Sequence, residues 1–197
     1  MCSSDLPAAS AVPAPFAIER YARSPNLSLT VARQPTGPVT TGFDGATAWS
    51  QDARGRVTAI AGTAASRARR DADIYPALNL TRQYERVAVQ GVEKIGTRDA
   101  YVVVAVPRGE SPEQFYFDVA SGLLVRHQRI STTALGEAPL ATDYDDYRDA
   151  GNGVKAPYTI HIVGPSRPDC ATITFERIQL NVAIDDTRFV RPPSTAQ

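Results

Sequence analysis

The residues of this chain that could do chemistry are a run of acids, two histidines and two cysteines. The segment DYDDYRDAGNG carries four aspartates within seven positions, at Asp143, Asp145, Asp146 and Asp149. Clustered carboxylates bind hard cations, and calcium loops end in a bidentate glutamate at their twelfth place. A loop that starts at Asp143 has Val154 there, so the frame fails. We interpret the segment as a strand end that runs into a Gly-Asn-Gly turn, with its acids facing water.

The histidines and cysteines form no catalytic or metal-binding pattern. His127 and His161 stand outside any HExxH or CxxCH spacing, so we expect each to be a structural or surface histidine of a strand. Cys2 and Cys170 give no disulfide framework and no zinc spacing, and we expect Cys170 to be a small structural residue. The chain also has no GxSxG elbow and no P-loop. These absences predict a protein that is not an enzyme and binds no metal.

A third polar feature is the run RARR, which contains Arg67, Arg69 and Arg70. Such a run could bind an anion, but Asp71 and Asp73 follow it at once. The mixture of signs favours a solvated helix face.

The elements that must position any site are mostly strands joined by hairpins. Leu27, Leu29 and Val31 alternate with smaller or polar residues, which predicts a strand buried on one side. The run 101–106 is apolar at every position and should lie deep in a sheet. Turns are expected at Asp44-Gly45, near Gly96, near Ser121-Gly122 and at 151–153. The pattern predicts a mainly β fold of roughly ten strands, in one curled antiparallel sheet.

One region, residues 63–84, interrupts the strands and predicts helices. Thr63 can cap a helix, and alanines recur after it at helical spacing. Pro76 should end that helix, and residues 78–84 can form a second one. Short helices in this place would cover the open side of a curled sheet.

The bulk numbers describe one globular domain. The chain has 197 residues with 21 basic and 21 acidic side chains, so its formal net charge is zero. A nucleic-acid-binding protein would show a basic excess, and no apolar run reaches the ~20 residues that span a bilayer. Residues 7–15 are rich in Pro and Ala and are typical of a linker. We therefore expect residues 1–15 to be a non-native start with a linker, and residues 16–197 to form a single domain.

Large apolar side chains suggest a binding site beneath the helices. If the helical lid can move, the sheet face under it becomes an apolar cavity for a lipid-like ligand, and if it cannot, the same residues are simply core. Arg67, Arg69 and Arg70 could then meet an anionic head group at the rim. The expected ligand-binding residues are Trp49, Ile74, Tyr75, Leu78, Tyr101, Phe115 and Phe117.

Several segments resemble a known family. These are FDGATAW, RDADIYPALNL, FYFDVASGLLVR, DYDDYRDAGNGVKAPYTI and the ending ITFERIQLNVAIDDTRFVRP. They are similar to the bacterial outer-membrane lipoprotein-sorting family, the LolA/LolB-like fold, over roughly residues 16–192. The resemblance implies an unclosed antiparallel β-barrel with a helical lid over a cavity that accepts acyl chains. It also implies a periplasmic or cell-envelope location. The matching residues belong to turns and strand ends, so they indicate the fold more strongly than transport.

The hairpin TTALGEAP before DYDDYRD resembles one subgroup of that family most. In this subgroup the domain is fused behind a c-type cytochrome similar to the reaction-centre cytochrome subunit. This chain has no CxxCH motif, so haem c would belong to a part upstream of it. The resemblance therefore leaves two functions open. One is a lipid or lipoprotein acyl-chain carrier, and the other is an accessory domain of an electron-transfer cytochrome.

The start MCSSDL matches the end of a common short-read sequencing adapter when it is back-translated with a GTG start codon. We therefore expect residues 1–6 to be non-native and the chain to be a fragment truncated before Pro7. Truncation would also explain why the chain lacks a signal peptide, the first helix that is usual in the family, and the haem module.

Overall fold

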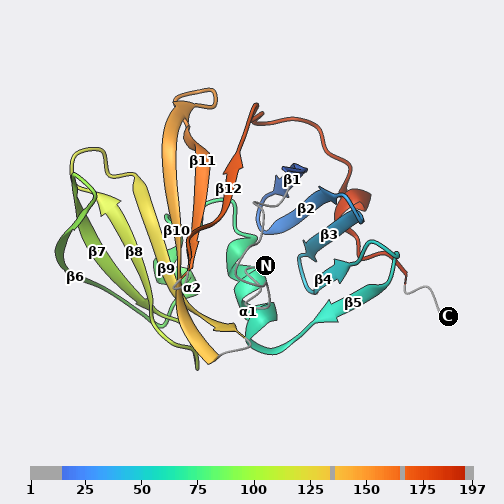
Figure 1. The fold of residues 1–197 in the computed structure, drawn as a ribbon, viewed down its shortest axis with the longest axis horizontal. Helices are drawn as coiled ribbons and strands as arrows, with labels where there is room; N and C mark the ends of the chain where they lie inside the picture. The colour runs from blue at the N-terminus through green and yellow to red at the C-terminus, as the bar shows by residue number, and fades with distance from the viewer. Residues whose placement is uncertain (1–14, 134–135, 165–166, 194–197) are drawn as a thin grey trace. The chain divides into compact units, whose positions relative to one another are not determined.

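The computed structural model of this chain describes residues 15–133, 136–164 and 167–193 (Figure 1). The predictions for the first 14 residues, Cys2 included, and for the Cys170 side chain lie outside the described part. The chain divides into two compact units. One contains Leu80–Val182, and the other is built from Ala11–Asn79 together with Ala183–Gln197. The first unit is thus inserted into the second along the chain.

The five-stranded unit begins with an antiparallel meander in which each strand pairs with the next along the chain. The strands are β1 (Ala17–Arg23), β2 (Leu27–Gln34), β3 (Gly37–Asp44), β4 (Ala48–Gln51) and β5 (Val57–Ile60). The alternation predicted for β2 is confirmed, because Leu27, Leu29 and Val31 all join one apolar cluster on one face of the sheet.

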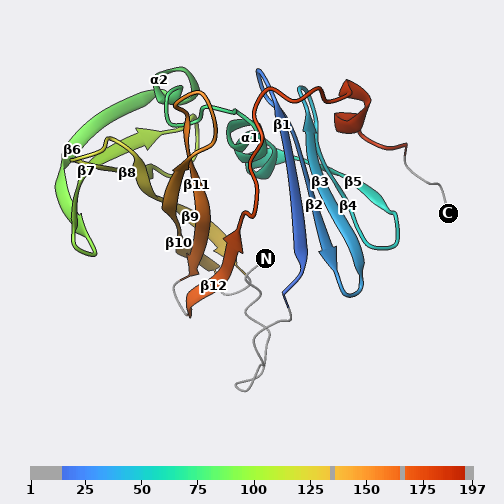
Figure 2. The ribbon, with the colours of Figure 1, turned by 90° about the horizontal axis from the view of Figure 1, so that it is seen from above.

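Both faces of this sheet are covered. On one face Leu29 and Trp49 pack with Phe189 of the short helix η1 (Asp186–Phe189), whose first turn Asp185 caps by accepting a hydrogen bond from the Thr187 amide. On the other face Phe43 and Ala48 pack against the alanines of helix α1 (Gly62–Asp71). Figure 2 shows α1 on one side of the sheet and η1 on the other. Apolar side chains at both faces therefore end up in core.

Trp49 is seated directly over a glycine. Gly42 pairs with Trp49 across β3 and β4, and Trp49 is only 2 % exposed. A Cβ atom on Gly42 would lie 2.6 Å from two ring carbons of Trp49. A side chain at position 42 would force the Trp49 ring or the strand to shift, because real Cβ atoms do not approach other atoms so closely.

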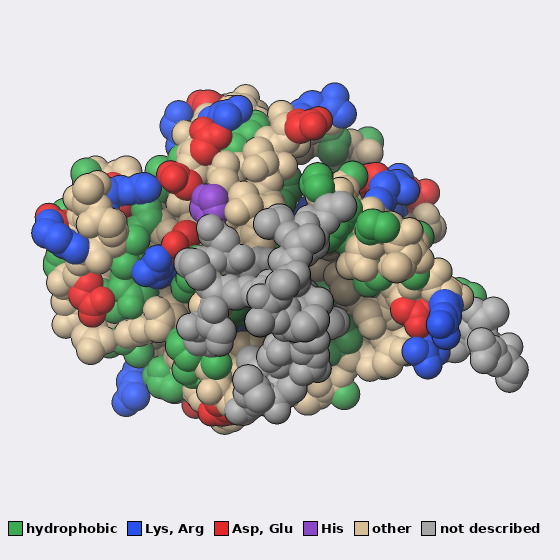
Figure 3. Space-filling model, in the orientation of Figure 1, with side chains coloured by type: hydrophobic (Ala, Val, Ile, Leu, Met, Phe, Trp, Pro, Cys, Tyr) green, Lys and Arg blue, Asp and Glu red, His purple; other side chains and the backbone are tan. Residues whose placement is uncertain are grey.

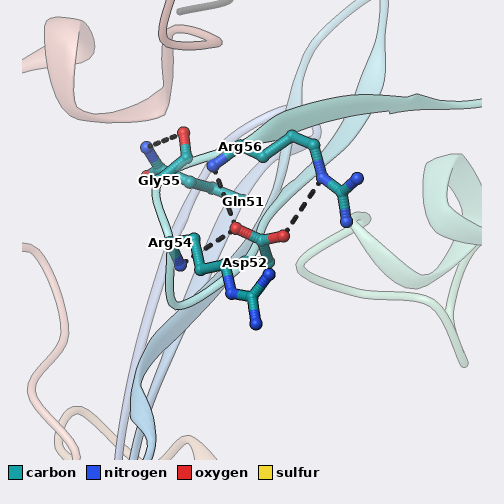
Figure 4. Close-up of polar contacts among 5 residues, drawn as sticks. All are labelled: Gln51, Asp52, Arg54, Gly55 and Arg56. Atoms are coloured by element: carbon teal, nitrogen blue, oxygen red, sulfur yellow. Dashed lines mark hydrogen bonds and ion pairs between the residues drawn. The ribbon is translucent and has the colours of Figure 1, made fainter. Parts of the chain in front are cut away.

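The turn between β4 and β5 is organised by Asp52 (Figure 4). Its Oδ1 accepts hydrogen bonds from the backbone amides of Arg54, at 3.0 Å, and Arg56, at 2.9 Å. The bond from the Arg56 amide is the main cause that holds the pKa of the Asp52 carboxyl below its usual value. Gly55 supplies the left-handed backbone, with φ of 83°, that closes the turn.

The seven-stranded unit contains a second antiparallel meander, preceded by the short helix α2 (Leu80–Gln83). Its strand order follows the chain from β6 at one edge to β12 at the other. The strands are β6 (Arg86–Ile95), β7 (Arg98–Val106), β8 (Glu113–Asp118), β9 (Leu124–Thr133), β10 (Gly136–Asp149), β11 (Lys155–Gly164) and β12 (Arg167–Thr174).

The hairpin turns of this sheet lie where the sequence places them. Gly96 and Gly122 take the left-handed backbone between β6 and β7 and between β8 and β9. Asp118 closes the second of these turns by accepting hydrogen bonds from the Ser121 amide and hydroxyl. The same hydrogen bonds lower the pKa of the Asp118 carboxyl. The FDVASGLL motif is therefore a turn and strand motif, as its resemblance to the family implies.

The mainly β, antiparallel and unclosed fold predicted from the sequence is confirmed. The described residues contain twelve strands in two sheets, whereas the sequence predicts roughly ten strands in one sheet. The two α-helices lie in the interval 62–83, close to the expected 63–84. Helix η1 was not expected, because four residues carry no helical periodicity and depend on the packing of Phe189.

Candidate functional site

An apolar surface lies on one face of the seven-stranded sheet. Strand register places Val92 opposite Tyr101 and Val89 opposite Val103, and Tyr101 stands opposite Phe117. These side chains lie on the same face, because directly paired residues of neighbouring strands point the same way. We call the set of Val89, Val92, Tyr101, Val103, Phe117 and Leu124 the apolar sheet face.

Helix α2 covers only one part of this face. Leu80 and Tyr84 pack there against Ala105 and Phe115, and Val103, Phe117 and Leu124 border that cluster. Farther along, Val89 is 67 % exposed, Val92 53 % and Tyr101 45 %. Neighbouring exposed apolar side chains of this kind are typical of a surface that binds something. The apolar sheet face is therefore the candidate functional site.

A buried polar network lies beneath α2. Glu113 Oε2 accepts a hydrogen bond from the Tyr84 hydroxyl at 2.8 Å and contacts His127 Nε2 at 2.7 Å. The His127 ring stacks on Phe115 with ring centroids 4.2 Å apart. The Glu113 side chain is 4 % exposed and that of His127 is 11 % exposed, so neither faces an open site. The network therefore fixes Tyr84, and with it the end of α2, onto the sheet.

The acid-rich segment of β10 is engaged in ion pairs. Arg126 binds Asp143 through two hydrogen bonds of 2.5 and 2.7 Å, and this contact raises the pKa of the arginine further. The other three aspartates pair with Arg98, Arg148 and Lys155. Asp143 is thus a partly buried ion-pair partner, and three of the four acids are more exposed, as expected. Within the described ranges no three His, Cys, Asp or Glu side chains gather as metal ligands.

Tyr147, in the same segment, has a structural role. Its hydroxyl donates a 2.6 Å hydrogen bond to the Leu124 carbonyl, which ties β10 to the start of β9. Burial raises the pKa of this phenol well above its usual value. Tyr147 therefore stays protonated and acts as a hydrogen-bond donor over the physiological pH range.

The expected ligand-binding residues fall into two groups. Tyr101, Phe115 and Phe117 lie together on one face of the seven-stranded sheet, with Phe115 under α2. Trp49, Ile74, Tyr75 and Leu78 belong to the five-stranded unit. Trp49 is part of its core, whereas Tyr75 and Leu78 are exposed by 54 % and 81 % in the segment between α1 and α2.

The arginine run is not the uniformly solvated face that the sequence favours. Arg69 is exposed, but Arg70 is only 8 % exposed. Arg70 therefore cannot contribute its charge to a rim that meets a head group. Residues two positions apart on an α-helix point to nearly opposite sides, so Arg70 lies on the side of α1 away from Ala68 and Ala72, which pack against the sheet.

Sequence reasoning missed Val89, Val92 and the Glu113–His127 pair. In the sequence the two valines look like ordinary strand residues. Their exposure could not be predicted, because it depends on which parts of the sheet the rest of the chain covers. Glu113 and His127 are 14 residues apart and meet only through the register of β8 and β9, which includes an irregularity near Tyr116.

The surface charges match the neutral composition. On the face drawn in Figure 3, the coloured Lys and Arg side chains are interspersed with Asp and Glu over the described residues. No helix in the described part of the chain has the length and apolar character needed to cross a membrane.

No known family model matches the chain, and no curated protein does either. Solved structures do share its fold. A domain described as that of an outer membrane lipoprotein-sorting protein from Vibrio parahaemolyticus has a TM-score of 0.60 at 14 % identity, covering 88 % of this chain and 80 % of that one. A DUF1329 family protein from Desulfovibrio piger has a TM-score of 0.60 at 16 % identity, covering 89 % and 81 %. A LolA superfamily protein from Nitrosomonas europaea has a TM-score of 0.53 at 12 % identity, covering 89 % and 87 %. The chain therefore has a LolA-like fold.

Proposed function

We propose that this chain is a non-enzymatic binding protein that holds a lipid or lipoprotein acyl chain on its apolar sheet face. The observation that carries the proposal is the exposure of Val89, Val92 and Tyr101 side by side on strands β6 and β7. A protein that needed these side chains only for stability would bury them.

An acyl chain suits this face for physical reasons. Binding of a flexible hydrocarbon needs apolar area and no fixed polar partners, and it gains about 0.8 kcal/mol for each buried CH₂ group. Val89 and Val92 offer aliphatic contact, and Tyr101 adds a flat ring beside them. At the end of the same two strands, Lys94 and Asp99 form an exposed ion pair at 2.8 Å, where a polar head group could remain in water.

The fold likeness supports the same direction. One similar structure is described as a lipoprotein-sorting domain and another as a LolA superfamily protein. We propose on this basis that the chain works in the periplasm or elsewhere in the cell envelope. The second function considered, an accessory domain of a c-type cytochrome, is favoured by no specific observation in the described residues.

The proposal is tested by titrating the protein with a fluorescent fatty-acid probe. Val92→Asp places a charge on the apolar sheet face, and Leu78→Asp does so at the exposed segment before α2. The matched control is Val154→Asp, because Val154 is an exposed valine in the turn between β10 and β11.

We expect saturable binding by the wild type and by Val154→Asp, and at least about tenfold weaker binding by Val92→Asp, which corresponds to about 1.4 kcal/mol. Weakening by Leu78→Asp as well would show that the exposed segment before α2 also contributes to binding. Equal binding by the wild type, Val92→Asp and Val154→Asp, or no saturable signal from the wild type, would remove the carrier proposal.

A further inference from the structure

Strand β6 forms an edge of the seven-stranded sheet. It pairs with β7 on one side, and no other described strand pairs with its far side. At ten residues it is long for an edge strand, and eight of those residues are exposed. The unpaired backbone groups of such an edge can add a strand from another chain.

The sequence of this edge is complementary to itself. When Glu85–Lys94 is laid antiparallel to a second copy with residues 89 and 90 at the centre, opposite charges meet and similar apolar residues meet. The four outer pairs are Glu85 with Lys94, Arg86 with Glu93, Val87 with Val92, and Ala88 with Gly91, and the fifth, central pair is Val89 with Gln90. Two-fold symmetry repeats each pair, so that the arrangement contains four ion pairs in all.

A bulge in β6 makes this arrangement geometrically consistent. The pairing with β7 shifts register between Val89 and Gly91, which leaves Gln90 as an extra residue. As a result, Arg86 and Glu93 stand opposite Val106 and Ala100, which lie on the same face of β7. In a regular strand, residues seven positions apart would point to opposite faces and could not pair across the two-fold axis.

The bulge also brings the two residues of the apolar pair, Val87 and Val92, onto one face. Val87 stands opposite Ala105 and Val92 opposite Tyr101, so both valines lie on the side of the apolar sheet face. In the proposed arrangement Val87 of one copy meets Val92 of the other. The apolar faces of the two sheets would then lie on the same side of one continuous sheet.

Two of the charges involved have no ion-pair partner among the residues that the structure describes. Glu85 pairs with Arg108 and Lys94 with Asp99, but Arg86 and Glu93 form no ion pair within the described part of the chain. Both are exposed and lie on the same face near opposite ends of β6. Opposite charges that face each other across paired strands stabilise the pairing, and like charges destabilise it.

We infer that β6 is a self-association edge, at which two copies of this chain pair antiparallel about a two-fold axis between residues 89 and 90. The interaction does not require the proposed acyl-chain binding, because the backbone edge and the charges of β6 stabilise it, although Val92 takes part in both. It would produce a dimer whose formation weakens at high salt, since its ion pairs are exposed.

The test is sedimentation equilibrium of the wild type and of charge-reversal variants over a wide range of protein concentration. Arg86→Glu and Glu93→Arg each replace two opposite-charge contacts with two like-charge contacts, and should weaken dimerisation about tenfold or more. The double variant Arg86→Glu/Glu93→Arg restores opposite charges and should recover the wild-type dimer. Arg54→Glu makes the same reversal in the exposed β4–β5 turn and serves as the control.

Thermal melting of each variant verifies that it is folded, and the rescue by the double variant separates pairing from loss of structure. A wild type that stays monomeric at every concentration would overturn the inference. A dimer whose stability neither single reversal changes would also overturn it. So would a dimer that Arg54→Glu weakens as much as Arg86→Glu does, because either result places the contact elsewhere.

Discussion

The two sheets of this protein differ in what covers them. In the five-stranded unit α1 covers one face and η1 the other, so that Phe43, Trp49 and Leu29 are each at most 6 % exposed. In the seven-stranded unit α2 has four residues and covers only the part of one face around Ala105 and Phe115. Both sheets carry apolar strands, but among the described strand residues only the seven-stranded sheet leaves neighbouring apolar side chains exposed.

This difference separates stability from binding. Apolar residues with a cover contribute to folding, and their replacement should change the free energy of unfolding. Apolar residues without a cover contribute little to folding, so their presence has to be explained by something that the chain binds. Trp49 against Val92, and Gly42 against Gly91, are matched positions in the two sheets at which that distinction can be tested.

The largest effect is expected for Trp49→Ala in the five-stranded unit. Loss of a fully buried tryptophan should lower the free energy of unfolding by about 3–5 kcal/mol in a denaturant titration. The exposed counterpart Val92→Ala should change it by no more than about 0.5 kcal/mol. If Val92→Ala destabilises as strongly as a core substitution, the apolar sheet face is covered in solution and the comparison fails.

A pair of strand glycines gives the next largest contrast. Gly42→Ala would press a methyl group into the Trp49 ring, and should destabilise by about 1–3 kcal/mol. Gly91→Ala meets no atom within 4 Å and should be neutral or slightly stabilising. Equal melting temperatures for the two variants would show that Trp49 moves aside freely.

A substitution in the buried network under α2 should lower the free energy of unfolding by a similar or smaller amount. Tyr84→Phe removes the hydroxyl that donates to Glu113 in a buried place and should destabilise by about 1–3 kcal/mol. Tyr101→Phe alters a phenol on the exposed part of the same sheet and should leave the denaturation midpoint unchanged. Exchange of the amide hydrogens of α2 should also accelerate in Tyr84→Phe, because the helix loses an anchor to the sheet.

The smallest effect is a pH dependence at the β4–β5 turn. The pKa of Asp52 lies below its ordinary value of 3.8, chiefly because its carboxylate accepts the Arg56 amide. A carboxylate of this kind stabilises the fold above its unfolded-state pKa, and the contribution is lost as pH falls through the lowered pKa. Asp52→Ala should therefore be less stable than the wild type near neutral pH, and the difference should shrink on acidification.

The matched variant Asp52→Asn keeps one acceptor oxygen but cannot ionise. Its deficit against the wild type should likewise vanish once the wild-type carboxyl is protonated. A deficit of Asp52→Ala that stays constant down to the lowest pH at which the protein is folded would show that the charge of Asp52 is irrelevant to the turn.

Local features of the fold could be predicted because short-range chemistry determines them. The Asp44-Gly45 turn forms where expected, with the Asp44 carboxylate accepting hydrogen bonds from the amides of Ala46 and Thr47. The alternation in β2 correctly gives its buried face, and the alanine-rich run after Thr63 correctly gives a helix. Each of these predictions depends on residues a few positions apart.

The remaining features depend on contacts between distant segments. Alternation predicts that Trp49 and Val92 each lie on an apolar face, but it cannot show that Phe189 covers the first and that the second stays exposed. The division into two sheets could not be predicted either, because the strands after α2 show the same hairpin pattern as the strands before α1. For the candidate site, the apolar pattern of the sequence suggests Tyr101 and Phe117 but neither Val89 nor Val92.

The return of the chain to its first sheet has a consequence for the order of folding. Phe189 and Ile184 pack on Tyr21, Leu29 and Trp49, and Arg23 forms an ion pair with Asp186, 163 residues farther along. A ribosome makes the N-terminal strands first. During synthesis Trp49 therefore stays unpacked on this face until almost all of the chain has been made and Phe189 can pack on it. The inserted unit lacks that dependence and can fold while the first sheet is still incomplete. The folding intermediate would then have a native seven-stranded unit and an incomplete five-stranded unit. Chaperone binding should therefore concentrate on strands β1 to β5.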